Sequence, residues 1–215
     1  MNDKINVMIV EDQAMPRQLF ETIVKTNPRL NLVLSIDNAE IADICCSRQS
    51  IDLVLMDVVT KNGASGIVAS EKIKKKNKDI KIIIVTSMPE CSYIDRAKKI
   101  GVEGFWYKDF GKEPISSLIE RVLNGETVYP KNKPEVMLGL AKGSDFTERE
   151  LEILREMTGG FTNAEIAEKK GLSEKRVRNV VTIMLEKTGF RNRTELAVRA
   201  REAGIVILER KDGDI

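Results

Sequence analysis

Polar residues able to handle a phosphoryl group follow four apolar runs in the first half of the chain. The runs, rich in Val and Ile, occupy residues 5–10, 51–56, 80–85 and 104–107. The residues directly after them are Glu11, Asp12, Asp57, Thr86 and Lys108. A carboxylate can accept a phosphoryl group as a nucleophile, and a hydroxyl and an ammonium can hold the oxygens of that group. Each residue alone fits a turn or a helix cap, but their joint placement indicates one phosphoryl site.

The elements that position these residues read as an α/β fold. Strand-like and helix-like segments alternate through residue 124, which predicts a flavodoxin-like, doubly wound sheet of five parallel strands. The predicted strands are residues 5–10, 31–36, 51–56, 81–85 and 104–107, and the predicted helices are 14–26, 38–47, 66–76, 90–99 and 113–124. Ligands of such sheets bind at the carboxyl ends of the strands, so the polar residues should meet at one edge.

Three carboxylates at neighbouring strand ends need a counter-charge. Glu11, Asp12 and Asp57 would repel one another unless a cation lies among them. Oxygen ligands of this kind suit Mg²⁺, which we expect as the cofactor.

Composition limits the other possibilities. The 215 residues include no His, which excludes zinc sites built on His and His general bases. The three cysteines are an odd number for a disulfide framework, and adjacent Cys45 and Cys46 lack metal-ligand spacing, so we expect reduced thiols. No apolar stretch approaches the ~20 residues of a membrane span, and charges interrupt the N-terminus from Asp3 onward. We therefore expect a cytoplasmic protein without a membrane partner.

The second half of the chain reads as a small all-α domain of four helices. Residues 1–125 form the predicted first domain, residues 126–143 with Pro130 and Pro134 a linker, residues 144–209 the helical domain, and residues 210–215 a tail. Each helix has its own N-terminal signal. These signals are Thr147 with Glu150, Thr162 with Glu165, Ser173, and Asn192 with Glu195.

Two of these helices, at 163–170 and 174–187, are joined by a short turn at Gly171 and fit a helix-turn-helix. The second of them has an apolar back formed by Val177, Val180, Val181, Met184 and Leu185. Its opposite face carries Lys175, Arg178, Asn179, Thr182 and Glu186. Residues 145–168 hold two basic and seven acidic residues (net −5), whereas residues 169–201 hold ten basic and three acidic ones (net +7). A basic surface around a recognition helix favours double-stranded DNA as the partner.

This half resembles a LuxR-type DNA-binding domain over about 60 residues. The matching pieces are residues 146–150 (FTERE), 160–167 (GFTNAEIA) and 173–177 (SEKRV), and one departure is Val180, where the family often has His. The resemblance implies that Arg178, Asn179 and Thr182 contact bases. Lys175, Lys187, Arg191 and Arg193 are the expected phosphate contacts.

The first half resembles the receiver domain of bacterial response regulators over residues 4–124. The matching pieces are residues 7–12 (VMIVED), 52–57 (DLVLMD), 84–87 (IVTS) and 101–108 (GVEGFWYK). The resemblance implies that Asp57 is the phosphoacceptor. It implies a Mg²⁺ site formed by Glu11, Asp12, Asp57 and the backbone carbonyl of Val59. By the same resemblance, Thr86 is the switch hydroxyl and Phe105 is the switch aromatic. Lys108 is the lysine that contacts the phosphate.

Together the two halves resemble a response regulator of the NarL/FixJ type. The resemblance implies phosphotransfer from a sensor histidine kinase to Asp57, after which Thr86 is recruited and Phe105 turns inward. Dimerisation, promoter binding and contact with RNA polymerase would follow.

Two alternatives also fit the sequence. The loop 58–66 has Lys61 where the family usually has Pro, and Gly66 falls one residue late, which suits a DNA-binding regulator that works without phosphorylation. A metal-dependent phosphohydrolase would use the same carboxylates but leaves the second half unexplained, so we expect a transcription regulator and not an enzyme.

Overall fold

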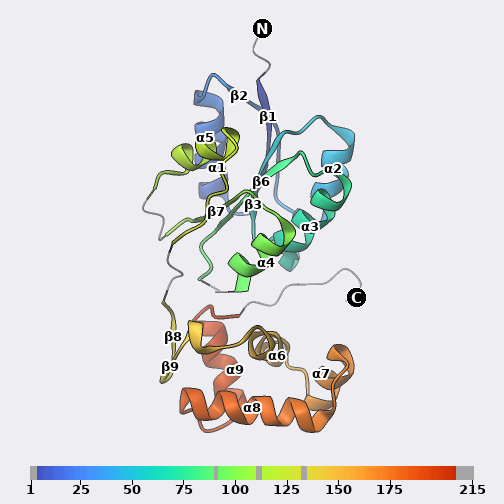
Figure 1. Cartoon of the computed structure of the whole chain (residues 1–215), viewed down its shortest axis with the longest axis vertical. Coiled ribbons are helices and arrows are strands. Elements are labelled where there is room, and N and C mark those ends of the chain that lie inside the picture. Colours follow the sequence, from blue (N-terminus) through green and yellow to red (C-terminus); the bar gives the residue numbers. More distant parts are fainter. Residues whose placement is uncertain (1–3, 90–91, 110–112, 132–134, 207–215) are drawn as a thin grey trace. The chain divides into compact units, whose positions relative to one another are not determined.

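The computed structural model describes residues 4–89, 92–109, 113–131 and 135–206, and it divides into two compact units (Figure 1). The first unit contains residues 4–87 and 93–131, and residues 135–206 form most of the second.

The first unit is built on a parallel sheet of five strands in the order β2-β1-β3-β6-β7. The strands are β1 Ile5–Val10, β2 Leu30–Ile36, β3 Leu53–Asp57, β6 Lys81–Thr86 and β7 Gly104–Tyr107. They are rich in Val, Ile and Leu because a parallel sheet is covered on both faces. The predicted five-stranded, doubly wound sheet is confirmed.

Helices cover both faces of this sheet (Figure 1). They are α1 Ala14–Thr26, α2 Ala42–Arg48, α3 Gly66–Lys76, α4 Ser92–Ile100 and α5 Ile115–Leu123, with a short 3₁₀ turn, η1 Ala39–Ile41, before α2. Helices α1 and α5 lie on one face, and their buried side chains, such as Phe20 and Leu118, pack with Val7, Leu55 and Ile83 of the strands. This core fixes the strands whose ends carry the polar residues.

The register of the strands aligns those ends. Asp57, the last residue of β3, pairs with Val85, and Thr86, the last residue of β6, pairs with Tyr107. Because Val10 pairs with Met56, Glu11 emerges level with Asp57. The residues that follow β1, β3, β6 and β7 therefore leave the sheet at the same edge.

The second unit is helical apart from a short hairpin. Its elements are β8 Met137–Leu138, β9 Ala141–Lys142, η3 Gly143–Asp145, α6 Glu148–Thr158, α7 Asn163–Lys170, α8 Glu174–Thr188 and α9 Arg193–Glu202. All four predicted N-terminal signals act as caps, since the side chains of Thr147, Thr162, Ser173 and Asn192 each accept a backbone N–H three residues on. Gly171 and Gly189 end α7 and α8 in the left-handed conformation that glycine adopts without strain.

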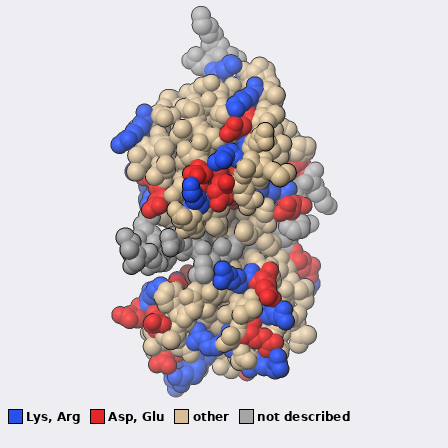
Figure 2. Space-filling model, turned by 180° about the vertical axis from the view of Figure 1, so that it is seen from behind, with Lys and Arg blue, Asp and Glu red and all other residues tan. Residues whose placement is uncertain are grey.

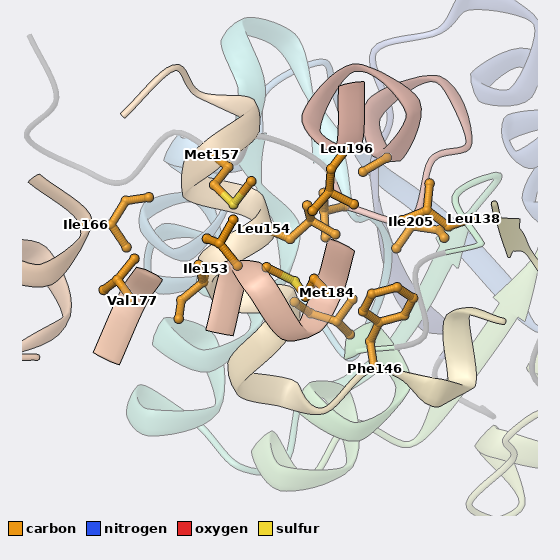
Figure 3. Close-up of a cluster of buried hydrophobic side chains, with 14 of the residues drawn as sticks. Leu138, Phe146, Ile153, Leu154, Met157, Ile166, Val177, Met184, Leu196 and Ile205 are labelled. Atoms are coloured by element: carbon orange, nitrogen blue, oxygen red, sulfur yellow. The ribbon is translucent and has the colours of Figure 1, made fainter. Parts of the chain in front are cut away.

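The core of the second unit lies where its helices meet. In Figure 3 the side chains of Met157, Ile166, Val177 and Leu196, one from each of the four helices, point into the same cluster. On α8 the predicted apolar back is present, with Val177, Val181 and Met184 buried and Val180 and Leu185 partly buried against the cluster. The opposite face of α8 is thereby left to solvent.

The residues predicted as a linker, 126–143, are structured at both ends. Residues 126–131 belong to the first unit, where Val128 pairs with Gly104 of β7. Residues 137–142 form the β8–β9 hairpin of the second unit, and Leu138 and Ala141 lie in its core. The predicted end of the helical domain at 209 and the tail 210–215 fall outside the described residues.

Candidate functional site

Lys108 joins two of the carboxylates at the carboxyl edge of the sheet. Its Nζ lies 2.5 Å from Glu11 Oε2 and 2.8 Å from Asp57 Oδ2. All three side chains are buried, with exposed fractions of 8%, 0% and 6% respectively. The other oxygen of Asp57, Oδ1, accepts a hydrogen bond from the backbone N–H of Val58 at 2.7 Å. Asp57 is thus held in one orientation at the carboxyl edge of the sheet.

Charge and burial oppose each other in this cluster. Burial raises the pKa of Asp57, Lys108 opposes that rise, and Glu11 adds to it by repulsion. Burial alone would lower the pKa of Lys108, but Asp57 and Glu11 together raise it above its ordinary value. The ammonium therefore stays charged between two carboxylates, and one positive charge faces the three acidic groups of the cluster.

The three acidic side chains could hold a metal ion. Carboxylate oxygens of Glu11, Asp12 and Asp57 lie within 4.8 Å of one another. Asp12 Oδ1 is buried and has no hydrogen-bond partner among the described residues. A buried oxygen without a partner is costly unless a ligand completes it, and a hard divalent cation fits this donor set.

Thr86 and Phe105, the two predicted switch residues, lie on the neighbouring strands β6 and β7. Both are buried, and the backbone carbonyl of Thr86 accepts a hydrogen bond from the Lys108 N–H at 2.8 Å. The Phe105 ring is 1% exposed and packs edge-on against Tyr107, with ring centroids 5.1 Å apart. The ring already occupies the inward position that sequence analysis assigned to the phosphorylated state.

The unusual loop after Asp57 folds as a small hairpin. Strands β4 Val59–Thr60 and β5 Ala64–Ser65 pair around the turn η2 Lys61–Gly63. Within the turn, Asn62 and Gly63 have φ of 62° and 74°, so the extra residue is absorbed in left-handed conformations.

The two departures from the family pattern in this loop, Lys61 and Gly66, lie in different surroundings. Lys61, which replaces the usual Pro, forms an ion pair of 2.9 Å with Asp37. A Cβ atom on Gly66 would lie 1.8 Å from the carbonyl oxygen of Asp57, so only glycine fits where α3 begins. Val59 lies in β4, two residues beyond Asp57, where its carbonyl is the predicted metal ligand.

The solvent face of α8 carries the predicted base-contacting residues. Lys175, Arg178, Asn179 and Thr182 are all exposed. Arg178 forms an exposed ion pair of 2.8 Å with Glu174, one turn earlier. Figure 2 shows basic side chains, together with acidic ones, along the edge of this unit that Figure 1 labels α8.

Two of the predicted phosphate contacts, Lys187 and Arg193, bond to groups within the unit in this structure. The Lys187 ammonium lies 2.8 Å from both carboxylate oxygens of Glu150 and 2.9 Å from the carbonyl of Asp145. The Arg193 guanidinium donates to Asn163 Oδ1 and to the carbonyl of Phe161. Both cations hold the helices of the unit together. Arg191 is exposed and forms an ion pair with Glu195.

Other residues near these sites were not predicted from the sequence. Arg176 and Ile183 are also exposed on α8, because the exposed face is broader than the stripe opposite the core. Tyr129 stacks on Phe105, with ring centroids 6.5 Å apart. Its only signal in the sequence is the short apolar pair it forms with Val128 before Pro130.

The fold and the two sites define a DNA-binding response regulator, and comparison with known proteins supports this class. The model of the response regulator receiver domain matches residues 7–120, and the model of bacterial regulatory proteins of the luxR family matches residues 144–200. The chain belongs to the family of response regulators that carry a receiver domain and a LuxR-type DNA-binding domain.

Characterised relatives match over almost their whole length. The transcriptional regulatory protein DesR of Bacillus subtilis is 30% identical over 93% of this chain and 98% of its own length. ComA, a transcriptional regulatory protein of the same organism, is 29% identical over 93% and 99%. These relatives and the two domains make the chain a transcription regulator.

Solved structures of RcsB share the fold. RcsB of Salmonella enterica serovar Typhimurium, bound to a promoter in the presence of a phosphomimetic, has a TM-score of 0.65 and 17% identity over 92% of this chain and 99% of its own. A structure of two RcsB dimers bound to two parallel DNAs has a TM-score of 0.60, also at 17% identity, over 93% and 98%. Among the described residues, no helix is long and apolar enough to cross a membrane.

Proposed function

We propose that Asp57 accepts a phosphoryl group from a histidine of a separate sensor kinase and thereby controls DNA binding by the second unit. An Asp57 oxygen forms a bond to phosphorus while the P–N bond to the kinase histidine breaks, and the bonding pair stays on the histidine nitrogen. The observation that carries this proposal is a buried carboxylate fixed between the Val58 N–H and the Lys108 ammonium, at the ligand-binding edge of the sheet.

Mg²⁺ is the cation we propose for this site, with Glu11, Asp12, Asp57 and the Val59 carbonyl as its protein ligands. When bound, it would offset the charge of the phosphoryl oxygens. The unpartnered Asp12 Oδ1 and the spacing of the three carboxylates support this assignment. Lys108 would move its contact from the two carboxylates to a phosphoryl oxygen, and Thr86 would donate a hydrogen bond to another.

Labelling with acetyl phosphate and Mg²⁺ tests the acceptor. The wild-type chain should take up one phosphoryl group, detected by intact mass, and Asp57→Ala should take up none. Asp37→Ala, which removes an exposed carboxylate of a neighbouring loop, is the matched control and should be labelled normally. Undiminished labelling of Asp57→Ala would reject the assignment. A wild-type chain that binds DNA but takes no label would favour the regulator that works without phosphorylation.

For the second unit we propose that α8 enters the major groove of promoter DNA. Arg178, Asn179 and Thr182 would contact bases, and Lys175 and Arg191 would contact phosphates. We further propose that the active form is a cytoplasmic homodimer that reads two half-sites and contacts RNA polymerase. The two RcsB dimers on DNA support this arrangement by analogy.

The switch between the two units is tested with Thr86→Ala and Phe105→Ala. Both variants keep the nucleophile, so both should still be labelled at Asp57. Phosphorylation should no longer tighten their DNA binding, because neither can favour the active arrangement of β6 and β7. Normal phosphate-dependent binding in both variants would contradict this role.

A further inference from the structure

The chain that leaves α5 covers the free edge of the sheet. It turns at Gly125, where φ is 90°, and runs back beside β7. The Val128 N–H donates to the Glu103 carbonyl at 2.8 Å, and the Phe105 N–H donates to the Val128 carbonyl at 2.9 Å. Val128 is 6% exposed and belongs to the core of the first unit. We name residues 126–131 the edge segment, because they pair with β7, the last strand of the sheet.

Tyr129 fastens the edge segment by its side chain as well. Its ring stacks on the ring of Phe105 at an interplanar angle of 25°. Its hydroxyl donates to the carbonyl of Val102 at 2.6 Å. The Lys98 ammonium lies 5.3 Å from the centre of the same ring. Three groups from α4, β7 and the intervening loop therefore hold one side chain.

These contacts connect the switch aromatic to the chain that leads on to the second unit. The Phe105 ring is fully buried, so it cannot leave its place without removing the surface on which Tyr129 stacks. The Phe105 backbone N–H also holds the edge segment directly. After Lys131 the chain continues toward residues 135–206, which form most of the DNA-binding unit. The edge segment is thus the part of the receiver nearest in sequence to the output domain.

We propose that Tyr129 is a positioning residue that couples the position of Phe105 to the attachment of the edge segment. With Phe105 inward, Tyr129 stacks and the edge segment stays paired with β7. With Phe105 outward, the stacking is lost and the edge segment detaches from β7. This inference rests on the proposed phosphorylation of Asp57, and it identifies the path by which that event reaches the output domain.

Hydrogen exchange of the full chain tests the coupling directly. The Phe105 and Val128 N–H groups make the pairing bonds and exchange only when these bonds open. Acetyl phosphate with Mg²⁺ should slow their exchange in the wild type, because the label should make the outward state of Phe105 rarer. Tyr129→Ala should be labelled at Asp57 as fully as the wild type but should show no such slowing. Tyr129→Phe keeps the stacked ring and loses only the hydroxyl, so it should retain most of the effect. Equal exchange rates with and without label in the wild type would mean that the edge segment does not respond to phosphorylation. That result would overturn the inference.

DNA affinity gives the functional readout. The probe is a duplex that the wild-type chain selects from random-sequence DNA, and the measured quantity is the ratio of Kd without label to Kd with label. Coupling between sites is typically about 5–150-fold, and the ratio should fall to about 1 in Tyr129→Ala. Glu126 lies in the same edge segment, and Glu126→Gln breaks its exposed ion pair with Arg121 of α5, so this variant should keep the wild-type ratio.

The possible failures are distinguishable. A wild-type ratio in Tyr129→Ala would overturn the coupling while leaving Asp57 as the acceptor. Absence of label on the wild-type chain, seen by mass, would reject the proposed function and the coupling together.

Discussion

The ammonium of Lys187 lies 2.8 Å from both carboxylate oxygens of Glu150, and this pair connects the last turn of α8 to the N-terminus of α6. One of these oxygens, Glu150 Oε2, also accepts a hydrogen bond of 2.7 Å from the backbone N–H of Thr147, the N-cap residue of α6. One lysine, which the basic sequence around it would assign to DNA, therefore completes a helix cap inside the unit.

Lys187→Met should destabilise the second unit by about 1–3 kcal/mol, because it leaves a largely buried carboxylate with fewer partners. Arg178→Met is the matched control. It removes an ion pair whose partners are 65% and 50% exposed, and it should cost less than about 1 kcal/mol. Hydrogen exchange of the Leu154 and Met184 amides would measure both values. Equal losses in the two variants would contradict the structural role of Lys187.

The contribution of Glu150 should depend on pH. Burial alone would raise the pKa of Glu150, but the Lys187 ammonium and the Thr147 N–H and hydroxyl hold this pKa below its ordinary value of 4.5. A carboxyl whose pKa is lower in the folded state stabilises the fold above the unfolded pKa, and the stabilisation is lost as pH falls through the folded pKa. The stability difference between wild type and Glu150→Gln should therefore be constant from pH 7 to 5 and shrink below about pH 4.5. A difference that grew on acidification would contradict this sign.

Lys108→Met should destabilise the first unit more than any exposed lysine does. Removing one partner of a buried ion pair costs about 3–5 kcal/mol, and here two buried carboxylates lose their shared cation. Added Mg²⁺ should recover part of the loss, because a ligand that binds only the folded state stabilises it. Urea unfolding with and without Mg²⁺ measures both effects.

Lys61→Met is the control for this experiment, since its ion pair with Asp37 is 59% and 44% exposed and should contribute less than about 1 kcal/mol. Similar losses in the two variants, or no gain from Mg²⁺ in Lys108→Met, would argue against a metal site among Glu11, Asp12 and Asp57.

Arg178→Ala and Lys175→Ala should differ in kind on DNA. Loss of a base contact at Arg178 should cost about 1–3 kcal/mol on the preferred duplex and relax the preference at one base position. Loss of a phosphate contact at Lys175 should weaken all duplexes alike and lower the salt slope by about one. The Lys187 ammonium already bonds to Glu150 within the unit. Lys187→Met should therefore leave the salt dependence of DNA binding unchanged. Titrations at several salt concentrations would separate these outcomes, and unchanged base preference in Arg178→Ala would contradict the placement of α8.

The sequence by itself was enough for the fold and for the class of protein. Apolar runs that end in Asp57 and Thr86 specify buried strands, since a parallel sheet covered on both faces needs continuous Val and Ile. The helix caps at Thr147, Thr162 and Ser173 are equally local, because each cap bonds a backbone N–H only three residues away. Patterns of this kind involve only residues that are close in the sequence, so the sequence alone is enough to predict them.

Contacts between residues distant in sequence were decided only by the tertiary structure. Lys187 and Glu150 are 37 residues apart, and a basic helix face looks the same in sequence whether its lysines reach DNA or a carboxylate of the same unit. Likewise, Val128 and Tyr129 were assigned to the linker, because the single bridge between Val128 and Gly104 is too short to give a periodic pattern in the sequence. Whether a charged or aromatic side chain faces solvent or another element depends on which elements pack together, and that choice is made by the whole core and not by local spacing.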